Sequence, residues 1–302
     1  MPGVPHLVPY QGSKRLLAPR ILALLGNRRF ARFFEPFAGS AAMSLAAAES
    51  SVARGFVIGE SLTALAALWK LCIEDPACLS DGYEALWNAQ HTDPRAHFES
   101  TRDAFNRSGD PVALLYLLAR CVKNAPRFAT DGRFNQSADH RRHGRKPRTV
   151  RTAAHAIAEL LQGRSVVHAA DFRTTCEDAT GDDLVYLDPP WIGTTVGRDK
   201  RYHAGLAEEP LIAFLDTMVE RDIPFLLSYD GRTGDQRYGQ PLPAALGLLH
   251  LEINAGRSSQ ATLSGRKART WESLYVSPGL ADAALMAMNG LVGVQRAQRG
   301  DD

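Results

Sequence analysis

Four consecutive residues in the second half of the chain, Asp188-Pro189-Pro190-Trp191, have the types needed to hold a flat base that carries an amino group. They follow the apolar run 183–187, and the carboxyl ends of such strands are where open α/β sheets bind ligands. Because the prolines have no N–H donors, the Asp188 carboxylate and the Pro189 carbonyl are adjacent acceptors without a competing donor. The Trp191 ring adds a stacking face. The tetrapeptide predicts a base pocket, and the alternative is a Pro-Pro turn that ends a strand.

A second group of residues has the pattern of a nucleoside site. Glu35-Pro36-Phe37-Ala38-Gly39 lies between a candidate strand and an alanine-rich helix, and Glu60 ends the next apolar run. An acid about 20 to 25 residues after a glycine turn is the spacing used for ribose recognition. Gly39 lets the backbone approach a ligand, and a carboxylate at Glu60 can accept hydrogen bonds from both ribose hydroxyls. Without GxxxxGK[ST] or a full GxGxxG, the pattern favours a nucleoside over a nucleotide. Taken singly, Glu35 is better interpreted as a solvated strand end and Glu60 as an acid at a helix N-terminus, and it is their joint spacing that favours the nucleoside site.

The elements that must position these residues alternate between strands and helices. We expect strands at 32–35, 55–60, 165–168, 183–187, 224–228, 250–253 and 272–276, and helices at 41–48, 62–73 and 208–220. This alternation predicts an α/β fold with a mostly parallel sheet. The region from 75 to about 161 has helical periodicity and no clear strand. We therefore expect a discontinuous catalytic domain, 1–74 and 165–302, and a helical domain, 75–164.

Taken together, the motifs have the order and spacing of a known family. Tyr10-Gln11-Gly12-Ser13-Lys14, then Glu35 to Gly39, then Asp188 to Trp191 resemble the Dam-like, D12-class adenine-specific DNA methyltransferases, over about residues 7 to 277. The resemblance implies a Rossmann-like, S-adenosylmethionine-dependent methyltransferase sheet with an inserted helical target-recognition domain. Two positions depart from the family pattern: Ala41 stands where a second glycine is usual, and Trp191 where Tyr or Phe is common.

The resemblance also implies roles for individual residues. Asp188 to Trp191 hold the target base, and Asp171 with Phe172 bracket the adenine ring of the cofactor. The implied cofactor-binding residues are Tyr10, Gly12, Lys14, Glu35, Pro36, Phe37, Gly39, Glu60, Asp171 and Phe172. The implied DNA-contacting loop contains Lys123, Asn124, Arg127, Arg133, Asn135 and Gln136.

Basic residues are concentrated in the segment 139–151. A formal net charge of +2 does not by itself imply a polyanionic partner. The segment, however, contains six Lys and Arg residues broken by glycine and proline, and such a loop can neutralise phosphates. The alternative is a solvated linker. The candidate phosphate contacts are Arg141, Arg142, Arg145 and Lys146. A second basic loop spans 256–269.

The expected reaction is transfer of a methyl group from S-adenosylmethionine to N6 of an adenine flipped out of duplex DNA, without a metal or a covalent enzyme intermediate. A restriction endonuclease is a candidate partner. The alternatives are cytosine-N4 methylation, a non-catalytic DNA-binding subunit that retains the fold, and, more weakly, a histidine-rich nuclease. The four cysteines have no zinc-ligand spacing. No apolar run approaches the roughly 20 residues of a membrane span, so we expect a cytoplasmic protein.

Overall fold

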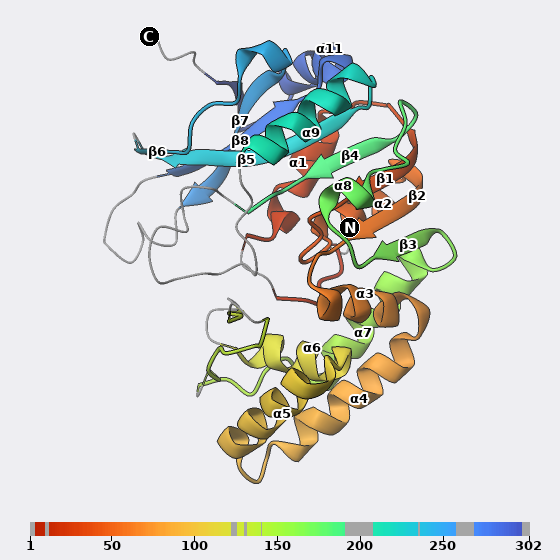
Figure 1. Ribbon diagram of the computed structural model, residues 1–302, viewed down its shortest axis with the longest axis vertical. Helices are drawn as coiled ribbons and strands as arrows, with labels where there is room; N and C mark the ends of the chain where they lie inside the picture. Colours follow the sequence, from red (N-terminus) through yellow and green to blue (C-terminus); the bar gives the residue numbers. More distant parts are fainter. Residues whose placement is uncertain are drawn as a thin grey trace.

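The centre of the molecule is a sheet whose larger part is parallel (Figure 1). The computed structural model describes residues 4–9, 12–121, 126–129, 132–139, 141–190, 208–234, 236–257 and 269–297. In this part of the chain the strand order is β3-β2-β1-β4-β5-β8-β7-β9, with β6 paired to β5. The strands are β1 Phe30–Glu35, β2 Ala53–Gly59, β3 Ser165–His168, β4 Leu184–Leu187, β5 Phe225–Thr233, β6 Gln236–Tyr238, β7 Leu249–Arg257, β8 Arg269–Val276 and β9 Val294–Arg296.

The alternation of strands and helices predicted this parallel sheet correctly. Strands β3, β2, β1, β4 and β5 are parallel neighbours, whereas β8, β7 and β9 extend the sheet through antiparallel pairs. All four residues of β4 are buried, which explains its continuous apolar sequence, since a strand covered on both faces needs no polar alternation. The seven predicted strands are confirmed. The short strands β6 and β9 were not predicted, because three residues are too few for a recognisable pattern.

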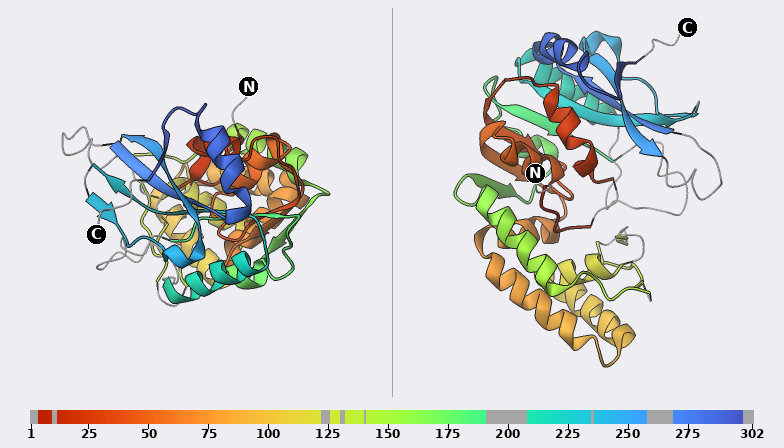
Figure 2. Two further views of the ribbon diagram at one scale, coloured as in Figure 1. Left: turned by 90° about the horizontal axis from the view of Figure 1, so that it is seen from above. Right: turned by 180° about the vertical axis from the view of Figure 1, so that it is seen from behind.

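Helices cover both faces of the sheet. One face packs against α8 Phe172–Thr175 and α9 Glu208–Glu220, through a cluster that includes Leu211, Leu215 and the β4 residue Leu187. The other face packs against α1 Ala18–Ala23, α2 Ala42–Glu49, α3 Thr63–Glu74 and α11 Pro278–Met288. The short helix η1 Lys14–Leu16 contacts α1 and α2. Figure 2 shows α1 and α11 from behind, on the side of the sheet opposite to the α9 helix seen in Figure 1. The result is a three-layer α/β arrangement.

Four helices make up most of the region from 76 to 161, as its periodicity predicted, whereas the described residues between α6 and α7 form turns and isolated bridges. It contains α4 Pro76–Ala89, α5 Pro94–Ser108, α6 Pro111–Arg120 and α7 Pro147–Leu161, which lie together beyond one end of the sheet (Figure 1). Three of these helices begin with an Asp-Pro pair in which the aspartate accepts backbone N–H bonds from the first turn. Such caps satisfy backbone N–H donors that have no partner inside the helix. Proline at the first helical position costs no hydrogen bond, because the N–H that it lacks would have had no partner there.

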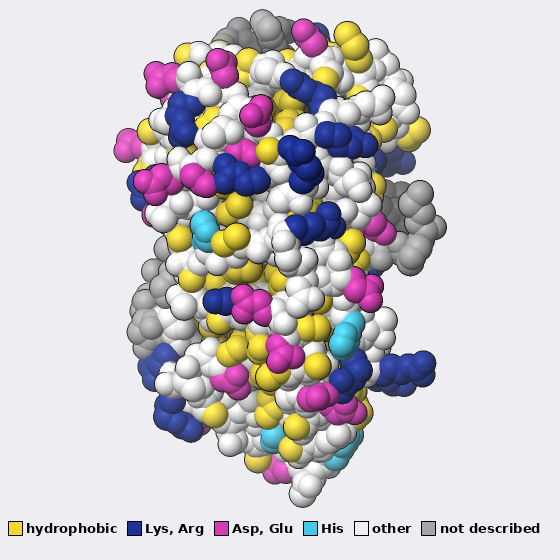
Figure 3. All heavy atoms as spheres, turned by 90° about the vertical axis from the view of Figure 1, so that its right-hand side faces the viewer, with side chains coloured by type: hydrophobic (Ala, Val, Ile, Leu, Met, Phe, Trp, Pro, Cys, Tyr) yellow, Lys and Arg dark blue, Asp and Glu magenta, His cyan; other side chains and the backbone are white. Residues whose placement is uncertain are grey.

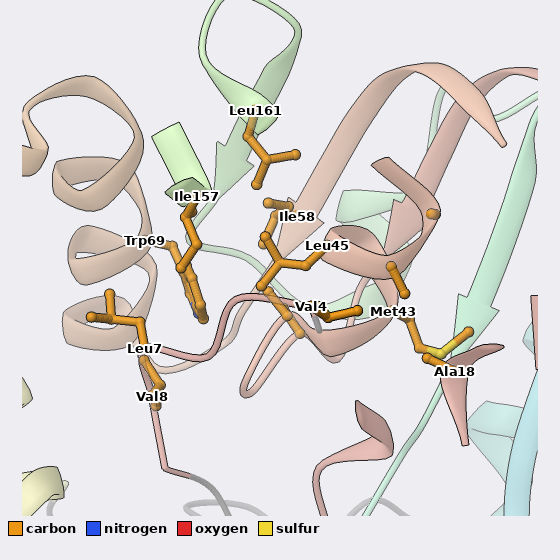
Figure 4. Close-up of a cluster of buried hydrophobic side chains, with 14 of the residues drawn as sticks. Val4, Leu7, Val8, Ala18, Met43, Leu45, Ile58, Trp69, Ile157 and Leu161 are labelled. Carbon is orange, nitrogen blue, oxygen red and sulfur yellow. The ribbon is translucent and has the colours of Figure 1, made fainter. Parts of the chain in front are cut away.

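The helical region and the sheet share one apolar core. Trp69 on α3 and Ile157 on α7 lie beside Ile58 of β2, and Leu7 of the N-terminal segment approaches the same cluster (Figure 4). Helix α3 also contacts α4, α6, α7 and β3, so it belongs by packing to both regions. Within the described residues no helix is long and apolar enough to cross a bilayer.

Candidate active site

Lys14 joins three segments of the chain at the carboxyl edge of the sheet. Its ammonium Nζ lies 2.9 Å from Oδ1 of Asp188, directly after β4. It also donates to the carbonyl of Gly12 at 3.2 Å and lies 3.5 Å from Oε2 of Glu272 on β8. The Lys14 side chain is buried. The sequence motifs that contain Lys14 and Asp188 therefore meet in space, and Glu272 joins them from the far part of the chain.

The environment of Asp188 raises the pKa of its carboxyl group. Burial raises this pKa to about 6, the ammonium of Lys14 opposes the rise, and the charge of Glu272 adds to it. Asp188 is therefore a carboxylate at neutral pH, with a second oxygen available as an acceptor. Beneath it, the hydroxyl of Tyr186 shares a 2.7 Å hydrogen bond with Ser228 of β5, and burial raises the pKa of that phenol well above its usual value.

The two prolines follow the end of β4. The strand ends at Leu187, Pro189 is buried and Pro190 is half-buried, as expected for residues that cannot donate to a ladder. Trp191 lies outside the described residues. The assignment of Asp188, Pro189, Pro190 and Trp191 to a base pocket stays a prediction, and the position of Asp188 at the sheet edge agrees with it.

The glycine turn after β1 is tied to the acid after β2. The backbone N–H of Gly39 donates to Oε2 of Glu60 at 3.1 Å, and Oε1 of Glu60 accepts the N–H of Leu62 at 3.0 Å. On its other side, the indole of Trp69 donates to the Gly39 carbonyl at 2.9 Å. Gly39 has a φ of 47°, which a glycine adopts without steric cost. Burial raises the pKa of Glu60, and the backbone bonds oppose that rise.

Ala41 shows why a glycine is usual at its position. It is buried and has a φ of 49°, in the left-handed region, immediately before α2. An L side chain in this conformation costs roughly 1–2 kcal/mol. The departure from the family pattern thus falls on a residue whose backbone conformation favours glycine.

The carboxylate of Glu35 lies against the first turn of α2. It is buried and accepts the backbone N–H groups of Met43 at 3.3 Å and Ser44 at 2.7 Å in the first turn of α2. Burial raises the pKa of Glu35 to about 7. Glu35 therefore binds the first turn of α2 from the end of β1, and its assignment to the cofactor site stays a prediction. Pro36 beside it is buried.

An aromatic stack borders the same turn. Phe37 stacks on Phe172 with ring centroids 5.3 Å apart, and Phe172 meets the edge of Phe214 at 5.0 Å. Asp171 accepts the N–H groups of Arg173 and Thr174, which caps α8 and lowers the pKa of its carboxyl group. Because Phe172 is buried between two rings, the partly exposed Phe37 offers the accessible ring at this turn.

The predicted DNA-contacting loop forms a small turn in its described part. Phe128 and Phe134 pair as an isolated bridge with both rings buried, whereas Arg127, Arg133 and Asn135 are exposed and Gln136 is half-buried. The backbone N–H of Asn135 donates to the Arg127 carbonyl at 2.9 Å. Tyr10, Lys123 and Asn124 lie outside the described residues. The second basic loop, 256–269, lies almost entirely outside them as well.

The basic segment contains two kinds of residue. Arg141, Arg142 and Lys146 are exposed. Arg145 instead donates to the backbone carbonyls of His6 and Leu7, and so it fastens the N-terminal segment to the helical region.

Ion pairing also limits the positive charge near this segment. Arg142 lies 3.7 Å from Asp139, and Arg151 on α7 pairs with Asp81 and Glu84 of α4. Figure 3 shows acidic and basic side chains interspersed over one face of the molecule. Asp139 therefore offsets part of the charge of Arg142, whereas the exposed side chains of Arg141 and Lys146 can present their charge to a phosphate.

Two carboxylates at this edge, the half-buried Glu272 and the buried Asp230, were not predicted as site residues. Glu272 begins the predicted apolar run of β8, and an acid at the start of such a run is the signal that could have identified it. Asp230, near the end of β5, is buried with a φ of 58°, and neither carboxylate oxygen has a hydrogen-bond partner within the described chain. Burial and the charge of Glu208 raise the pKa of Asp230 to about 6.

The fold and the site define an α/β enzyme of the Rossmann-like class, with its polar residues gathered at the carboxyl edge of the parallel strands. The sequence model of the D12 class N6 adenine-specific DNA methyltransferase family matches residues 10–252, and the chain belongs to this family. It is an enzyme that methylates N6 of adenine in DNA, which confirms the predicted activity over the cytosine-N4 and non-catalytic alternatives. No curated protein matches the chain. Among the described residues, no cluster of His, Cys, Asp and Glu has the arrangement of a metal site.

Proposed function

We propose that the chain transfers the methyl group of S-adenosylmethionine to N6 of an adenine that is flipped out of duplex DNA. The observation that carries this proposal is the buried Lys14–Asp188 contact of 2.9 Å, because it brings the N-terminal motif and the Asp-Pro-Pro motif into one site. Asp188 and the Pro189 carbonyl accept the two N–H bonds of the adenine amine, and Trp191 stacks on the ring.

The residues of the glycine turn fit a nucleoside-bearing cofactor. Glu60 uses one lone pair on each oxygen for Gly39 and Leu62, and a carboxylate has about four such acceptor sites. The remaining ones suit two ribose hydroxyls. Gly39 leaves the turn without a side chain, and Phe37 presents a ring beside it. We assign cofactor binding to Gly12, Gly39, Glu60 and Phe37, with Tyr10 beyond the described part, and a supporting role to Glu35, Asp171 and Phe172.

The chemistry requires positioning more than strong acid or base catalysis. S-adenosylmethionine supplies an electrophilic methyl group when bound. Hydrogen bonds from the amine to Asp188 and Pro189 favour a pyramidal nitrogen whose lone pair is aimed at that methyl group. Held in this way, the adenine amine would take up that methyl group and release one of its protons to water. Asp188 holds a negative charge beside the nitrogen as positive charge develops there.

Exposed basic and amide groups of the helical region suit contacts with duplex DNA. We propose that residues 75–164 form the target-recognition domain and that Arg127, Arg133, Asn135 and Gln136 contact DNA together with Arg141, Arg142 and Lys146. These side chains are at least partly exposed, as contacts to phosphates and base edges require. Arg145 is left out of this set, because its guanidinium already binds backbone carbonyls.

Analysis of the methylated product tests the proposal directly. Purified protein, duplex DNA and labelled S-adenosylmethionine should give N6-methyladenine in a nucleoside digest, and a protein with Asp188→Ala should give none. N4-methylcytosine in the digest, or no transfer from this donor, would refute the proposal. Single-molecule sequencing of DNA from expressing cells would then identify the recognition site. An endonuclease that cuts the same unmethylated site would be the partner we propose.

A further inference from the structure

Glu272 is brought to Asp188 by a close approach of β5 and β8. Glu272 pairs with Gly231 after an irregularity in the ladder that begins at Ser228. A Cβ atom on Gly231 would lie 2.3 Å from the carbonyl oxygen of Trp271, so a glycine is needed for the strands to come this close. The Glu272 carboxylate then reaches Lys14, the same ammonium that binds Asp188, at 3.5 Å.

Among the described residues, acidic groups outnumber basic ones in this cluster. One ammonium, that of Lys14, contacts two carboxyl groups, those of Asp188 and Glu272. An ammonium has three donors; Lys14 directs one to the Gly12 carbonyl and one to Asp188. Oε2 of Glu272 is buried and accepts no hydrogen bond within the described residues, so its contact with Lys14 is electrostatic.

This arrangement determines how much negative charge Asp188 can offer to a substrate. In a buried pair of one ammonium and one carboxylate, the charges largely cancel. When a second carboxylate contacts the same ammonium, the positive charge of that ammonium neutralises each carboxylate less completely. The effect is substantial at this site because charge–charge interactions are strong where water is largely excluded. Within the described part of the chain, Asp188 also acts on the ionisable groups of Tyr186 and Glu35. Neither of these carries a positive charge, and Lys14 is the described cation that contacts both Asp188 and Glu272.

We propose that Glu272 is a positioning residue for methyl transfer, which shares Lys14 with Asp188 and so keeps the free oxygen of Asp188 a strong acceptor for the adenine amine. The inference rests on the proposed role of Asp188. It assigns to the last third of the chain a part in the chemistry of the Asp-Pro-Pro motif. It also explains why the buried Oε2 atom of Glu272 accepts no hydrogen bond within the described residues, since its charge rather than its bonding is what the site uses.

The first test measures the carboxyl group of Asp188 in the cofactor-free protein. A 13C NMR titration of aspartate-labelled protein, assigned by comparison with Asp188→Asn, should give a lower pKa for Asp188 in Glu272→Gln than in wild type. The sign follows from removing a negative charge, which makes the ionised form of Asp188 easier to reach. Glu272→Asp keeps the charge and should restore most of the wild-type pKa. An unchanged pKa in Glu272→Gln would overturn the inference.

The second test measures the reaction. With the same DNA and donor, Glu272→Gln should lower kcat roughly tenfold, the effect of weakening one hydrogen bond to a charged group, with KM for the donor nearly unchanged. The acid limb of its kcat–pH profile should move to lower pH, in step with the NMR result. Glu272→Asp should recover much of the kcat. A wild-type kcat in Glu272→Gln would overturn the positioning role, even if the pKa of Asp188 moved.

A control separates this role from simple loss of structure. Glu252 on β7 is a buried acid of the same sheet, but it binds Arg232 through both oxygens, at 2.7 and 2.9 Å. Glu252→Gln should therefore lower the thermal midpoint of unfolding without moving the Asp188 titration. If Glu252→Gln moved that titration as much as Glu272→Gln does, the effect would be structural and the inference would fail. If wild-type protein gave no methylated adenine, the proposed function would fail, whereas the NMR result would still report on Glu272.

Discussion

The backbone N–H of Gly39 donates to the carboxylate of Glu60 at 3.1 Å, which joins the turn after β1 to the end of β2. The two residues come from different strand–helix connections, and the parallel pairing of β1 with β2 brings those connections to one edge. The same carboxylate accepts the N–H of Leu62 at the start of α3. Glu60 thus holds the shape of the glycine turn while keeping acceptor sites for a ligand.

Replacing Glu60 should weaken cofactor binding. We expect Glu60→Ala to reduce the affinity for S-adenosylmethionine by roughly 1.5–3 kcal/mol, the scale of hydrogen bonds to a charged group. Isothermal titration calorimetry measures this reduction, and the affinity for DNA without cofactor should change little. A cofactor dissociation constant equal to that of wild type would remove Glu60 from the ribose site.

Gly59 is expected to tolerate no side chain. A Cβ atom there would lie 2.5 Å from two atoms of Thr175 and 3.0 Å from the Cα of Pro36. Gly59→Ala should therefore lower the free energy of unfolding by roughly 1–3 kcal/mol through overpacking, as measured by urea denaturation. The matched control is Gly55→Ala on the same strand, where the nearest atom is the flexible Arg32 Cγ at 3.3 Å. Equal destabilisation of the two variants would contradict the expectation.

Asp188→Ala should separate catalysis from cofactor binding. The carboxylate is expected to contact the target amine, so methyl transfer should fall to background while the calorimetric affinity for S-adenosylmethionine stays within about 1 kcal/mol of wild type. This variant also removes an ion-pair partner of the buried Lys14, so thermal unfolding should accompany the assay. Wild-type turnover, or collapse of cofactor affinity in a folded variant, would show that the pocket is assigned wrongly.

The exposed basic residues should neutralise phosphates without sequence preference. Replacing Arg141, Arg142 and Lys146 with alanine should weaken binding to cognate and scrambled duplexes by similar factors. The slope of log K against log salt should flatten by about 0.9 for each phosphate that is no longer neutralised, as filter-binding titrations would show. If the variant discriminated less well between cognate and scrambled duplexes while its salt slope stayed fixed, these residues would contact base edges. If neither the affinity nor the slope changed, the segment would be a solvated linker.

Arg145 serves as the structural contrast to these residues. Because it donates to the carbonyls of His6 and Leu7, Arg145→Ala should lower the free energy of unfolding by roughly 1–3 kcal/mol, the cost of leaving buried acceptors unsatisfied. The triple alanine variant should leave that free energy nearly unchanged. Chemical denaturation of the two variants measures their free energies of unfolding. Equal values for Arg145→Ala and the triple alanine variant would contradict the prediction.

Asp230 is expected to destabilise the folded protein at neutral pH. Its folded-state pKa of about 6 is higher than the ordinary value, so the cost of the buried charge is present above that pH and fades as the pH falls below it. Asp230→Asn should raise the free energy of unfolding by about 1–3 kcal/mol at pH 8. Asparagine also accepts the left-handed backbone of this position.

The pH dependence and a second variant make the Asp230 prediction specific. The gain from Asp230→Asn should shrink towards pH 4, where the wild-type carboxyl group is protonated in the folded state. Asp183 is equally buried but accepts hydrogen bonds from Arg32 and Thr180, so Asp183→Asn should destabilise instead. Unfolding curves at several pH values provide both measurements, and a lower stability of Asp230→Asn at pH 8 would refute the argument.

Local sequence patterns determined the elements and the identity of the enzyme family. The apolar run of β4 and the Asp-Pro-Pro motif that ends it are adjacent in the chain, so their relation needs no tertiary information. The same is true of the glycine turn before α2 and of the Asp-Pro pairs that begin α4, α5 and α6. Each of these signals depends on neighbouring residues, whose conformational preferences and hydrogen bonds are local.

Tertiary structure alone decided which charged residues meet. Glu35 and Glu60 look alike in sequence, each at the end of an apolar run, yet one is buried beneath α2 and the other binds the glycine turn. Arg145 and Arg142 are three residues apart, yet only Arg145 reaches the carbonyls of the N-terminal segment. Glu272 meets Lys14 because the strand order places β8 beside β5. Long-range pairing of strands, which no local pattern contains, therefore determines the charge of the site.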